Sequence, residues 1–240
     1  MPQCNLTAEQ FRRAQCAELQ AWLRGAWDED HVRYELVEHS EVLNPFRELF
    51  GDRRFRRGLD VGVGPYGLGF LGAHLRQQID EIYGLDPLPL IKVDIGDPDL
   101  RQLVAEIRGR VKYIRGCGEY IPAAGGTFDI VACINVVDHA WQPSRIVAEI
   151  GRVLKPGGIL VFGVNTLSLM GELAWRLRRS LRPQDWFFVA HPHTFQWGSA
   201  DAMLRVILSK CVRVWTNKPS LWCRIAGHGR MSFWVAETKQ

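Results

Sequence analysis

The chain has 240 residues, of which 47% are hydrophobic and 23% are charged. This ordinary globular composition excludes a chain that is disordered throughout. No apolar run approaches the roughly 18 to 20 residues that a membrane span needs, and the amino terminus carries no apolar signal region. We therefore expect a cytoplasmic protein. Its six cysteines are expected to be free thiols, because none forms a CxxC pair or lies at zinc-ligand spacing.

Charge is divided unevenly along the chain. Residues 1–150 carry 17 Lys and Arg against 22 Asp and Glu, whereas residues 151–240 carry 13 against 4. The densest basic run is WRLRRSLRP, which contains Arg176, Arg178, Arg179 and Arg182. A solvated helix face without a partner is the favoured interpretation of this run. The alternatives are contact with an anionic acceptor, for example a phosphate, a nucleotide or a carrier-linked group, or with an anionic membrane surface.

The predicted elements begin with helices. Residues 7–24 have the pattern of an amphipathic helix, with Thr7 as its N-cap and Gln10 at the third position of a capping box. A second helix is predicted over residues 39–50, and Gly51 ends it. We expect these helices to form a cap on the rest of the domain.

From residue 58 on, strands and helices alternate. Strands are predicted near 58–62, 81–86, 111–115, 128–134 and 159–164, with helices after the first strand to about 78, at 98–108 and at 143–154. This alternation predicts a parallel sheet with helices on both faces. Helices at 167–180 and 200–209 then precede strands at 211–216 and 230–237. The 13 residues between these two strands leave no room for a crossover helix, so the strands should pair antiparallel.

The predicted fold class is therefore α/β. We expect a doubly wound, mostly parallel, seven-stranded sheet of the Rossmann-like type, with an antiparallel carboxyl-terminal edge and a helical amino-terminal cap.

The turn after the first strand is rich in glycine. Gly62-Val63-Gly64-Pro65-Tyr66-Gly67 matches GxGxxG, and Asp86 closes the next strand 19 residues later, where an acidic group accepts from ribose hydroxyls. Taken alone, this pattern fits a dinucleotide site. Asp60 favours another ligand, because a carboxylate suits an ammonium group better than a pyrophosphate. Pro65 also lacks the N–H that would donate to phosphate.

Several segments resemble one family. LDVGVGPYG resembles motif I of class I S-adenosylmethionine-dependent methyltransferases, and GLDPL resembles their acidic second motif. The similarity continues through GCGEYIPAAGGTFDIVACINVVDHAWQPSRIVAEIGRVLKPGGILVFGVN, so that it covers residues 58–164 in order. The resemblance implies a single methyltransferase domain over residues 1–240. It would comprise a helical cap at 1–50, a cofactor-binding core at 58–164 and substrate-side helices and strands at 165–240.

The resemblance implies S-adenosylmethionine as the cofactor, and it assigns the residues that bind it. Asp60 would orient the methionine end, and Asp86 would accept from both ribose hydroxyls. Two positions depart from the family pattern: Tyr66 stands where many relatives have a glycine, and Cys117 stands where many have an aspartate. The predicted cofactor-binding residues are Asp60, Gly62, Val63, Gly64, Tyr66, Asp86, Pro87, Leu88, Cys117, Gly118, Glu119 and Asn135.

The predicted catalytic residue is His139, which follows the strand at 128–134 at the edge where open α/β sheets bind ligands. Histidine suits proton removal near neutral pH, although a histidine here can also serve in capping or packing. Tyr34, His191 and His193 are predicted substrate contacts. The aromatic residues outside the core either line an apolar pocket or pack the outer helices onto the sheet. We expect no metal site.

The favoured function is S-adenosylmethionine-dependent methyl transfer to oxygen or nitrogen of a small molecule in biosynthesis, such as a sugar, a phenol, a quinone or a secondary metabolite. A nucleic-acid or protein methyltransferase is less favoured. No RNA-binding module is visible, and Ile134-Asn135-Val136-Val137 stands where base-directed amino methylases have an Asn/Asp-Pro-Pro-Tyr/Phe loop. A non-catalytic adenosylmethionine-binding scaffold and a nicotinamide oxidoreductase are further alternatives. The sequence does not indicate the oligomeric state.

Overall fold

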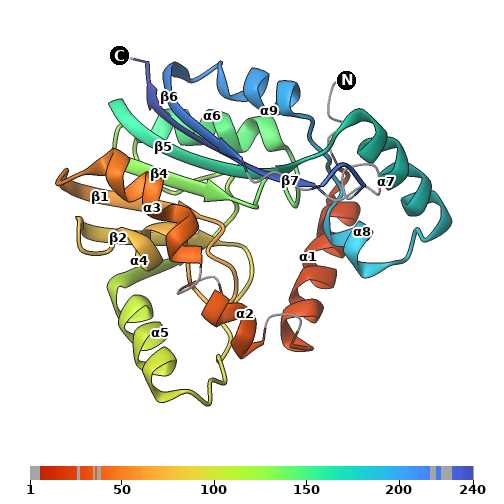
Figure 1. Ribbon diagram of the computed structural model, residues 1–240, viewed down its shortest axis with the longest axis horizontal. Helices are drawn as coiled ribbons and strands as arrows, with labels where there is room; N and C mark the ends of the chain where they lie inside the picture. The colour runs from red at the N-terminus through yellow and green to blue at the C-terminus, as the bar shows by residue number, and fades with distance from the viewer. Residues whose placement is uncertain are drawn as a thin grey trace.

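The computed structural model describes residues 6–25, 28–34, 36, 39–216, 220–222 and 229–239. Within these ranges, seven strands form one sheet in the order β3-β2-β1-β4-β5-β7-β6 (Figure 1). The first five strands pair in parallel, whereas β7 runs antiparallel to both β5 and β6. The strands are β1 Phe55–Val61, β2 Ile79–Asp86, β3 Val111–Arg115, β4 Phe128–Ile134, β5 Leu154–Thr166, β6 Leu208–Thr216 and β7 Arg230–Thr238. The predicted mixed α/β fold with an antiparallel edge is confirmed.

Helices cover both faces of the sheet, because successive strand residues point in opposite directions. In β4, Val131 and Cys133 pack with α6 and α9, whereas Ile130 and Ala132 pack with α3 and α4. Figure 1 shows these helices on the two sides of the sheet. The helices on the sheet are α3 His39–Phe50, α4 Phe70–His74, α5 Pro98–Arg110, α6 Pro143–Val153 and α9 Trp197–Leu204.

The remaining helices gather at the carboxyl ends of the parallel strands. Helix α1 packs against α8, and Figure 1 shows α7 beside them at this end of the molecule. The helix bounds are α1 Ala8–Leu23, α2 Glu29–Arg33, α7 Leu169–Leu181 and α8 Trp186–Ala190. The predicted capping box of α1 is confirmed, since Thr7 Oγ1 accepts from the Gln10 N–H at 3.2 Å.

Three details differ from the sequence prediction. Helix α4 has only five residues, because the chain after the glycine turn stays irregular to Gly69. Strand β5 begins at Leu154, five residues before its predicted start. Helices α2 and α8 were not predicted, since each is a single short turn of chain.

Among the described cysteines, Cys16, Cys117 and Cys133 are free thiols, whereas Cys4 and Cys223 lie outside the described residues. No helix in the described ranges is both long and apolar enough to cross a bilayer.

Candidate functional site

The glycine turn after β1 holds the chain close to the turn after β4. Gly62 has φ +76° and Gly64 has φ +66°, a left-handed conformation that side chains disfavour. A Cβ on Gly62 would lie 2.2 Å from Val136 Cγ2, so this approach requires glycine. Asn135, the first residue after β4, also has a positive φ of +55°; asparagine tolerates this region better than most residues do.

Asp86 connects the end of β2 to the glycine turn. Its Oδ2 accepts from the Gly64 N–H at 2.8 Å, and its Oδ1 accepts from the Leu88 N–H at 2.8 Å. The side chain is buried. Burial raises the pKa of Asp86 to about 6, and the two backbone hydrogen bonds limit that rise. The carboxylate thus holds the glycine turn beside the end of β2, and its contact with ribose hydroxyls stays a prediction.

Asp60, near the end of β1, contacts the start of α4. Both of its carboxylate oxygens accept from the Leu71 N–H at 3.0 Å, and Oδ2 also accepts from the Gly72 N–H at 3.2 Å. Burial raises its pKa to about 7 against the lowering effect of these bonds. A Cβ on Gly69 would lie 2.4 Å from this carboxylate. Asp60 therefore fastens the start of α4 to β1, and its role at the methionine end stays a prediction.

Glu119 also has structural partners. It is buried, and its Oε1 accepts from the Trp141 N–H at 2.7 Å and the Gln142 N–H at 3.1 Å, just before α6. Nearby, Gly118 is packed so closely that a Cβ would lie 3.0 Å from Val61 Cγ1. Burial, followed by the charges of Glu119 and Asp86, raises the pKa of the half-buried Cys117 thiol. Glu119 thus fixes the predicted adenine loop to α6 with a carboxylate oxygen that the sequence assigned to the adenine edge.

Two histidines meet at this edge of the sheet, after the carboxyl end of β4. His139 Nδ1 is 2.9 Å from the Ala190 carbonyl oxygen, and His191 Nδ1 is 2.8 Å from that of Phe187. A carbonyl oxygen only accepts, so each Nδ1 carries hydrogen and each neutral ring keeps its lone pair on Nε2. The two ring centroids are 4.2 Å apart. Their proximity was not predicted, because the two residues are far apart in sequence and meet only through the packing of α8.

Carboxylates surround His139. Its Nε2 lies 3.8 Å from Asp138 Oδ2, and its Nδ1 lies 3.7 Å from Glu18 Oε2 on α1. Burial lowers the pKa of His139, but the charges of Asp138 and Glu18 outweigh burial and raise it overall. Burial and the neighbouring His139 lower the pKa of His191. The pair thus combines a more basic and a less basic imidazole, an arrangement suited to moving a proton.

Asp138, His139 and His191 also form the group of described residues that comes nearest to a metal site. One ligand atom from each lies within 4.8 Å of the others, so a small cation would fit after a modest movement of the side chains. Asp138 Oδ1 is buried and has no hydrogen-bond partner among the described residues. The expectation of no metal site is therefore amended, because these three side chains could together hold a metal ion.

The other predicted substrate contacts are His193 and Tyr34. His193 is buried, and its Nε2 lies 2.9 Å from the Ala140 carbonyl oxygen. Its backbone N–H donates to the Asp138 carbonyl oxygen at 3.2 Å, so it joins the chain after α8 to the turn after β4. Its role as a substrate contact stays a prediction. Tyr34 follows α2 with 45% of its surface exposed, and its role stays a prediction.

Trp22 on α1 covers the glycine turn. A Cβ on Gly64 would lie 3.2 Å from Trp22 Cζ2. The Trp22 ring meets the Tyr66 ring edge-on at 4.8 Å, and its Nε1–H donates to Glu18 Oε1 at 2.8 Å. The aromatic residues of α1 were predicted to form either a lid or packing, and Trp22 lies where a lid would.

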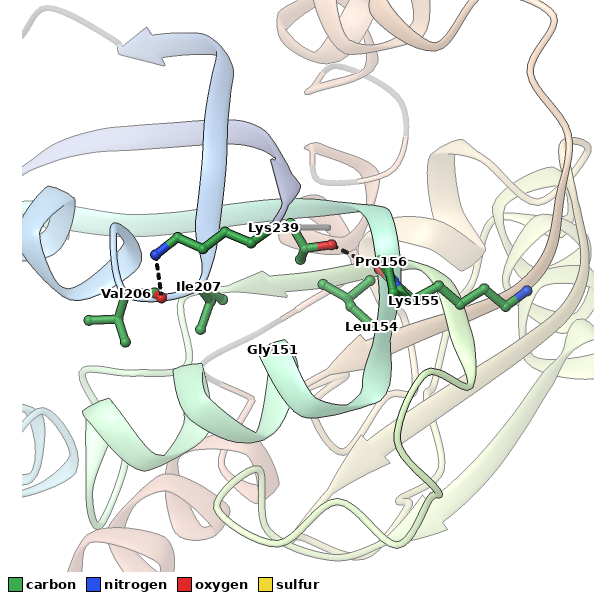
Figure 2. Close-up of a pocket in the computed structure, with 8 residues that line it drawn as sticks. Gly151, Leu154, Lys155, Pro156, Val206, Ile207 and Lys239 are labelled. Atoms are coloured by element: carbon green, nitrogen blue, oxygen red, sulfur yellow. Dashed lines mark hydrogen bonds between the residues drawn. The ribbon is translucent and has the colours of Figure 1, made fainter.

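A separate hollow of about 230 Å³ lies at the opposite edge of the sheet, where β5 begins (Figure 2). Its two lysines are engaged: Lys239 Nζ donates to the Val206 carbonyl oxygen at 3.1 Å, and Lys155 Nζ pairs with the Asp129 carboxylate. The hollow is lined by Gly151, Leu154, Lys155, Pro156, Val206, Ile207, Thr238 and Lys239. It is therefore remote from Asp86 and His139, which lie at the carboxyl ends of the strands.

Comparison with known proteins identifies the core. Residues 59–162 match the family of the methyltransferase domain. The chain is 35% identical over 106 residues to an uncharacterized methyltransferase of Mycobacterium sp. (strain KMS), which covers 44% of this chain and 37% of that protein. It is 31% identical over 142 residues to a ubiquinone biosynthesis O-methyltransferase of Azorhizobium caulinodans, with 57% and 49% covered. The chain thus spans at most about half the length of these relatives.

Similarity in fold to a solved structure extends beyond residues 59–162. The solved structure of the N-methyltransferase NodS from Bradyrhizobium japonicum WM9 in complex with S-adenosyl-l-homocysteine superposes with a TM-score of 0.59 at 14% identity. The superposition covers 92% of this chain and 98% of that chain. At this identity the likeness concerns the fold alone. The match over residues 59–162 therefore supports the resemblance to methyltransferases that the sequence motifs indicated, and the superposition adds a shared fold.

Proposed function

We propose that the chain transfers a methyl group from S-adenosylmethionine to the oxygen of a small aromatic acceptor, a phenol or a quinol. The observation that carries this proposal is the convergence of the glycine turn, Asp86 and the His139–His191 pair at one sheet edge. The family of the core supports use of S-adenosylmethionine. The O-methyltransferase among the relatives supports oxygen, and NodS keeps nitrogen as the alternative.

The residues of this edge fit the cofactor. Gly62 and Gly64 carry no side chain on a turn where the backbone must come close to a ligand. Each oxygen of Asp86 uses one lone pair for a backbone N–H, so both can still accept from a ribose hydroxyl. Trp22 would turn aside from Gly64 to admit the methionine end. When bound, S-adenosylmethionine supplies an electrophilic methyl group on a sulfonium.

His139 would take the proton of the acceptor. Its Nδ1–H is held by the Ala190 carbonyl oxygen, which leaves Nε2 as the basic atom. When the acceptor O–H bond breaks, the proton passes to Nε2, and the oxygen keeps the electron pair that forms the new bond to the methyl carbon. The carboxylates of Asp138 and Glu18 stabilise the imidazolium. A positioned base of this kind contributes about 10²–10⁴-fold to the rate.

Aromatic side chains beside His191 support an aromatic acceptor. The Phe187 ring centroid lies 4.4 Å from that of His191. Trp175 continues the cluster, with ring centroids 5.4 Å from Phe187 and 5.2 Å from Phe188. Rings of this kind bind a planar ring by stacking and edge contacts. The wall they form next to the proposed base would orient a hydroxyl-bearing ring toward it.

The first test is calorimetric titration with S-adenosylmethionine, S-adenosylhomocysteine and NAD in parallel. We expect the adenosyl compounds to bind and NAD not to bind. Asp86→Ala should weaken binding by about 1.5–3 kcal/mol, the value of a charged hydrogen bond. Asp99→Ala is the matched control, because Asp99 is exposed on α5. Binding of NAD alone, or an unchanged affinity in Asp86→Ala, would contradict the cofactor proposal.

The second test measures transfer of a labelled methyl group to phenols, quinols and amines. We expect His139→Gln to lower kcat by about 10²–10³-fold while the affinity for S-adenosylmethionine stays the same. An unchanged kcat would overturn the role of His139 as base and leave the cofactor assignment intact. Preferred transfer to amines would replace oxygen by nitrogen as the acceptor atom.

A further inference from the structure

Helix α7 exposes the residues that an ordinary surface helix buries. Its four leucines are all more than half exposed, from 52% for Leu173 to 73% for Leu181. Residues four apart on a helix are neighbours, so these leucines form a continuous ridge, which we call the leucine ridge. It comprises Leu169, Leu173, Leu177 and Leu181, with the exposed Met170 beside it. A surface helix normally turns its apolar stripe to the core, so α7 is inverted.

The opposite side of α7 is fixed to the protein. Gly171 is buried, and the Glu172 carboxylate accepts from the Gln196 side-chain amide. Trp175 packs against Phe187 and Phe188 of α8, and Arg179 Nη1 donates to the Pro192 carbonyl oxygen at 2.9 Å. These contacts set the rotation of the helix. The leucine ridge therefore cannot turn inward without breaking them, and its exposure is built into the fold.

Arginines lie along both sides of the leucine ridge. At about 100° per residue, the ridge spans an arc of roughly 120° from Leu169 to Leu181. On the same wheel Arg176, which pairs with the Glu172 carboxylate, lies about 20° before this arc, and Arg178 lies about 60° beyond it. Arg182 follows as the C-cap, where the backbone leaves the helical path. This pattern occurs within the part of the chain, residues 151–240, that has 13 Lys and Arg against 4 Asp and Glu. An apolar ridge between guanidinium groups matches the chemistry of an anionic bilayer surface.

We infer that α7 is an interfacial helix that docks the chain on an anionic phospholipid surface. The leucines would enter the boundary between headgroups and acyl chains, and the arginines would contact lipid phosphates. Trp186 and Phe187 at the start of α8 are 45% and 40% exposed, and aromatic residues are favoured at headgroup depth. A second copy of the chain fits this face less well, because two such faces would bring their arginines together.

Docking does not depend on the proposed methyl transfer, but it would add to it. Helix α8 packs against α7 through Trp175 and ends next to His191. A bilayer on the leucine ridge would therefore lie close to the acceptor side of the site. This arrangement suits an acceptor that is dissolved in the membrane.

The test is co-sedimentation of the full chain with phosphatidylcholine vesicles, with and without phosphatidylglycerol. We expect binding only to vesicles that contain phosphatidylglycerol, weakening as salt is added. The double variant Leu173→Glu with Leu177→Glu should reduce partitioning by about tenfold or more, because it puts charge in the apolar ridge. The control is Val206→Glu, which places one such charge on a 70% exposed apolar residue before β6, and the single variant Leu177→Glu matches it in charge.

Equal binding by the double variant and the wild type, or no binding of the wild type at low salt, would overturn the inference. A dimer that is lost in the double variant, without any vesicle binding, would also overturn it in favour of a second copy. Thermal melting and calorimetry with S-adenosylmethionine on the same samples keep the result separate from the proposed function. A variant that binds the cofactor but not vesicles has lost the surface alone, and a wild type that binds vesicles but no cofactor contradicts only the proposed function.

Discussion

Charged side chains are buried at the sheet edge that carries Asp86, whereas apolar side chains are exposed on the face that carries the leucine ridge. At the edge, Asp60, Asp86 and Glu119 are buried, and backbone N–H groups satisfy each of them. On α7, leucines are exposed while the aromatic and polar side packs inward. Burying a carboxylate and exposing a leucine both cost free energy. In the first region the buried carboxylates fix the geometry of the loops. In the second region the free-energy cost of exposing the leucines is offset only if another surface covers them.

The most sensitive point of the edge is Gly62. Gly62→Ala combines a left-handed φ of +76° with a Cβ only 2.2 Å from Val136, so we expect it to lower the free energy of unfolding by about 3–5 kcal/mol. Urea denaturation measures this change. Gly126→Ala is the control, because Gly126 has φ +64° but nothing within 4 Å of the added Cβ; it should cost about 1–2 kcal/mol. Equal costs would mean that packing against Val136 does not hold the turn.

Asp60 should make the stability of the protein depend on pH. Its folded pKa of about 7 lies above that of an unfolded aspartate, near 3.9, so the folded state holds the proton more tightly. Its contribution is then full at low pH and is lost as the pH rises from about 4 through about 7. Relative to Asp60→Asn, the wild type should lose roughly 4 kcal/mol of unfolding free energy across this window. Parallel pH profiles from urea melts of the two proteins would contradict the buried-carboxylate interpretation.

Asp86 should give cofactor binding the opposite dependence on pH. Its pKa of about 6 means that the ionised form, which accepts best from hydroxyls, disappears as the pH falls. We expect the affinity for S-adenosylhomocysteine to fall by about tenfold for each pH unit below 6. Calorimetry across this range measures the effect, and Asp86→Asn should bind more weakly with a flat profile. A flat profile for the wild type would remove Asp86 from the ribose contact.

The leucine ridge should contribute almost nothing to folding. We expect Leu177→Gln to change the free energy of unfolding by less than about 0.5 kcal/mol, because the side chain is 62% exposed. Leu71→Ala on α4, where the leucine is fully buried, should cost about 2–5 kcal/mol. Urea melts of both variants compare the two regions directly. A large loss in Leu177→Gln would show that part of the chain already covers the ridge.

Local sequence patterns predicted the sheet edge that carries Asp86 better than they predicted the face that carries the leucine ridge. The glycine turn, the acidic end of β2 and the strand alternation follow from spacing, so the sequence predicted the sheet and singled out Gly64 and Asp86, which the structure joins by a hydrogen bond. Asp60 and His193 were assigned to ligands because their types suit that chemistry, and these assignments stay predictions. Both residues also contact backbone groups of other segments, and such partners have no spacing signal.

The histidine pair and α7 depended on tertiary packing. His139 was found as a candidate from its place after β4, but its contact with His191 requires α8, which is too short to be predicted from periodicity. For α7 the sequence predicted a helix at 167–180 with an arginine run. Periodicity shows that such a helix has two sides, but it does not show which side faces the protein.

Trp22 links entry of the proposed cofactor to the packing of α1. Its ring lies over Gly64 and its Nε1–H is held by Glu18, whose carboxylate also lies beside His139. Under the proposed function, a cofactor that reaches Gly64 would have to displace the ring, so its entry and release would require this side chain to move. Because α1 also packs against α8, such a movement would couple the glycine turn to the helix that ends beside His191.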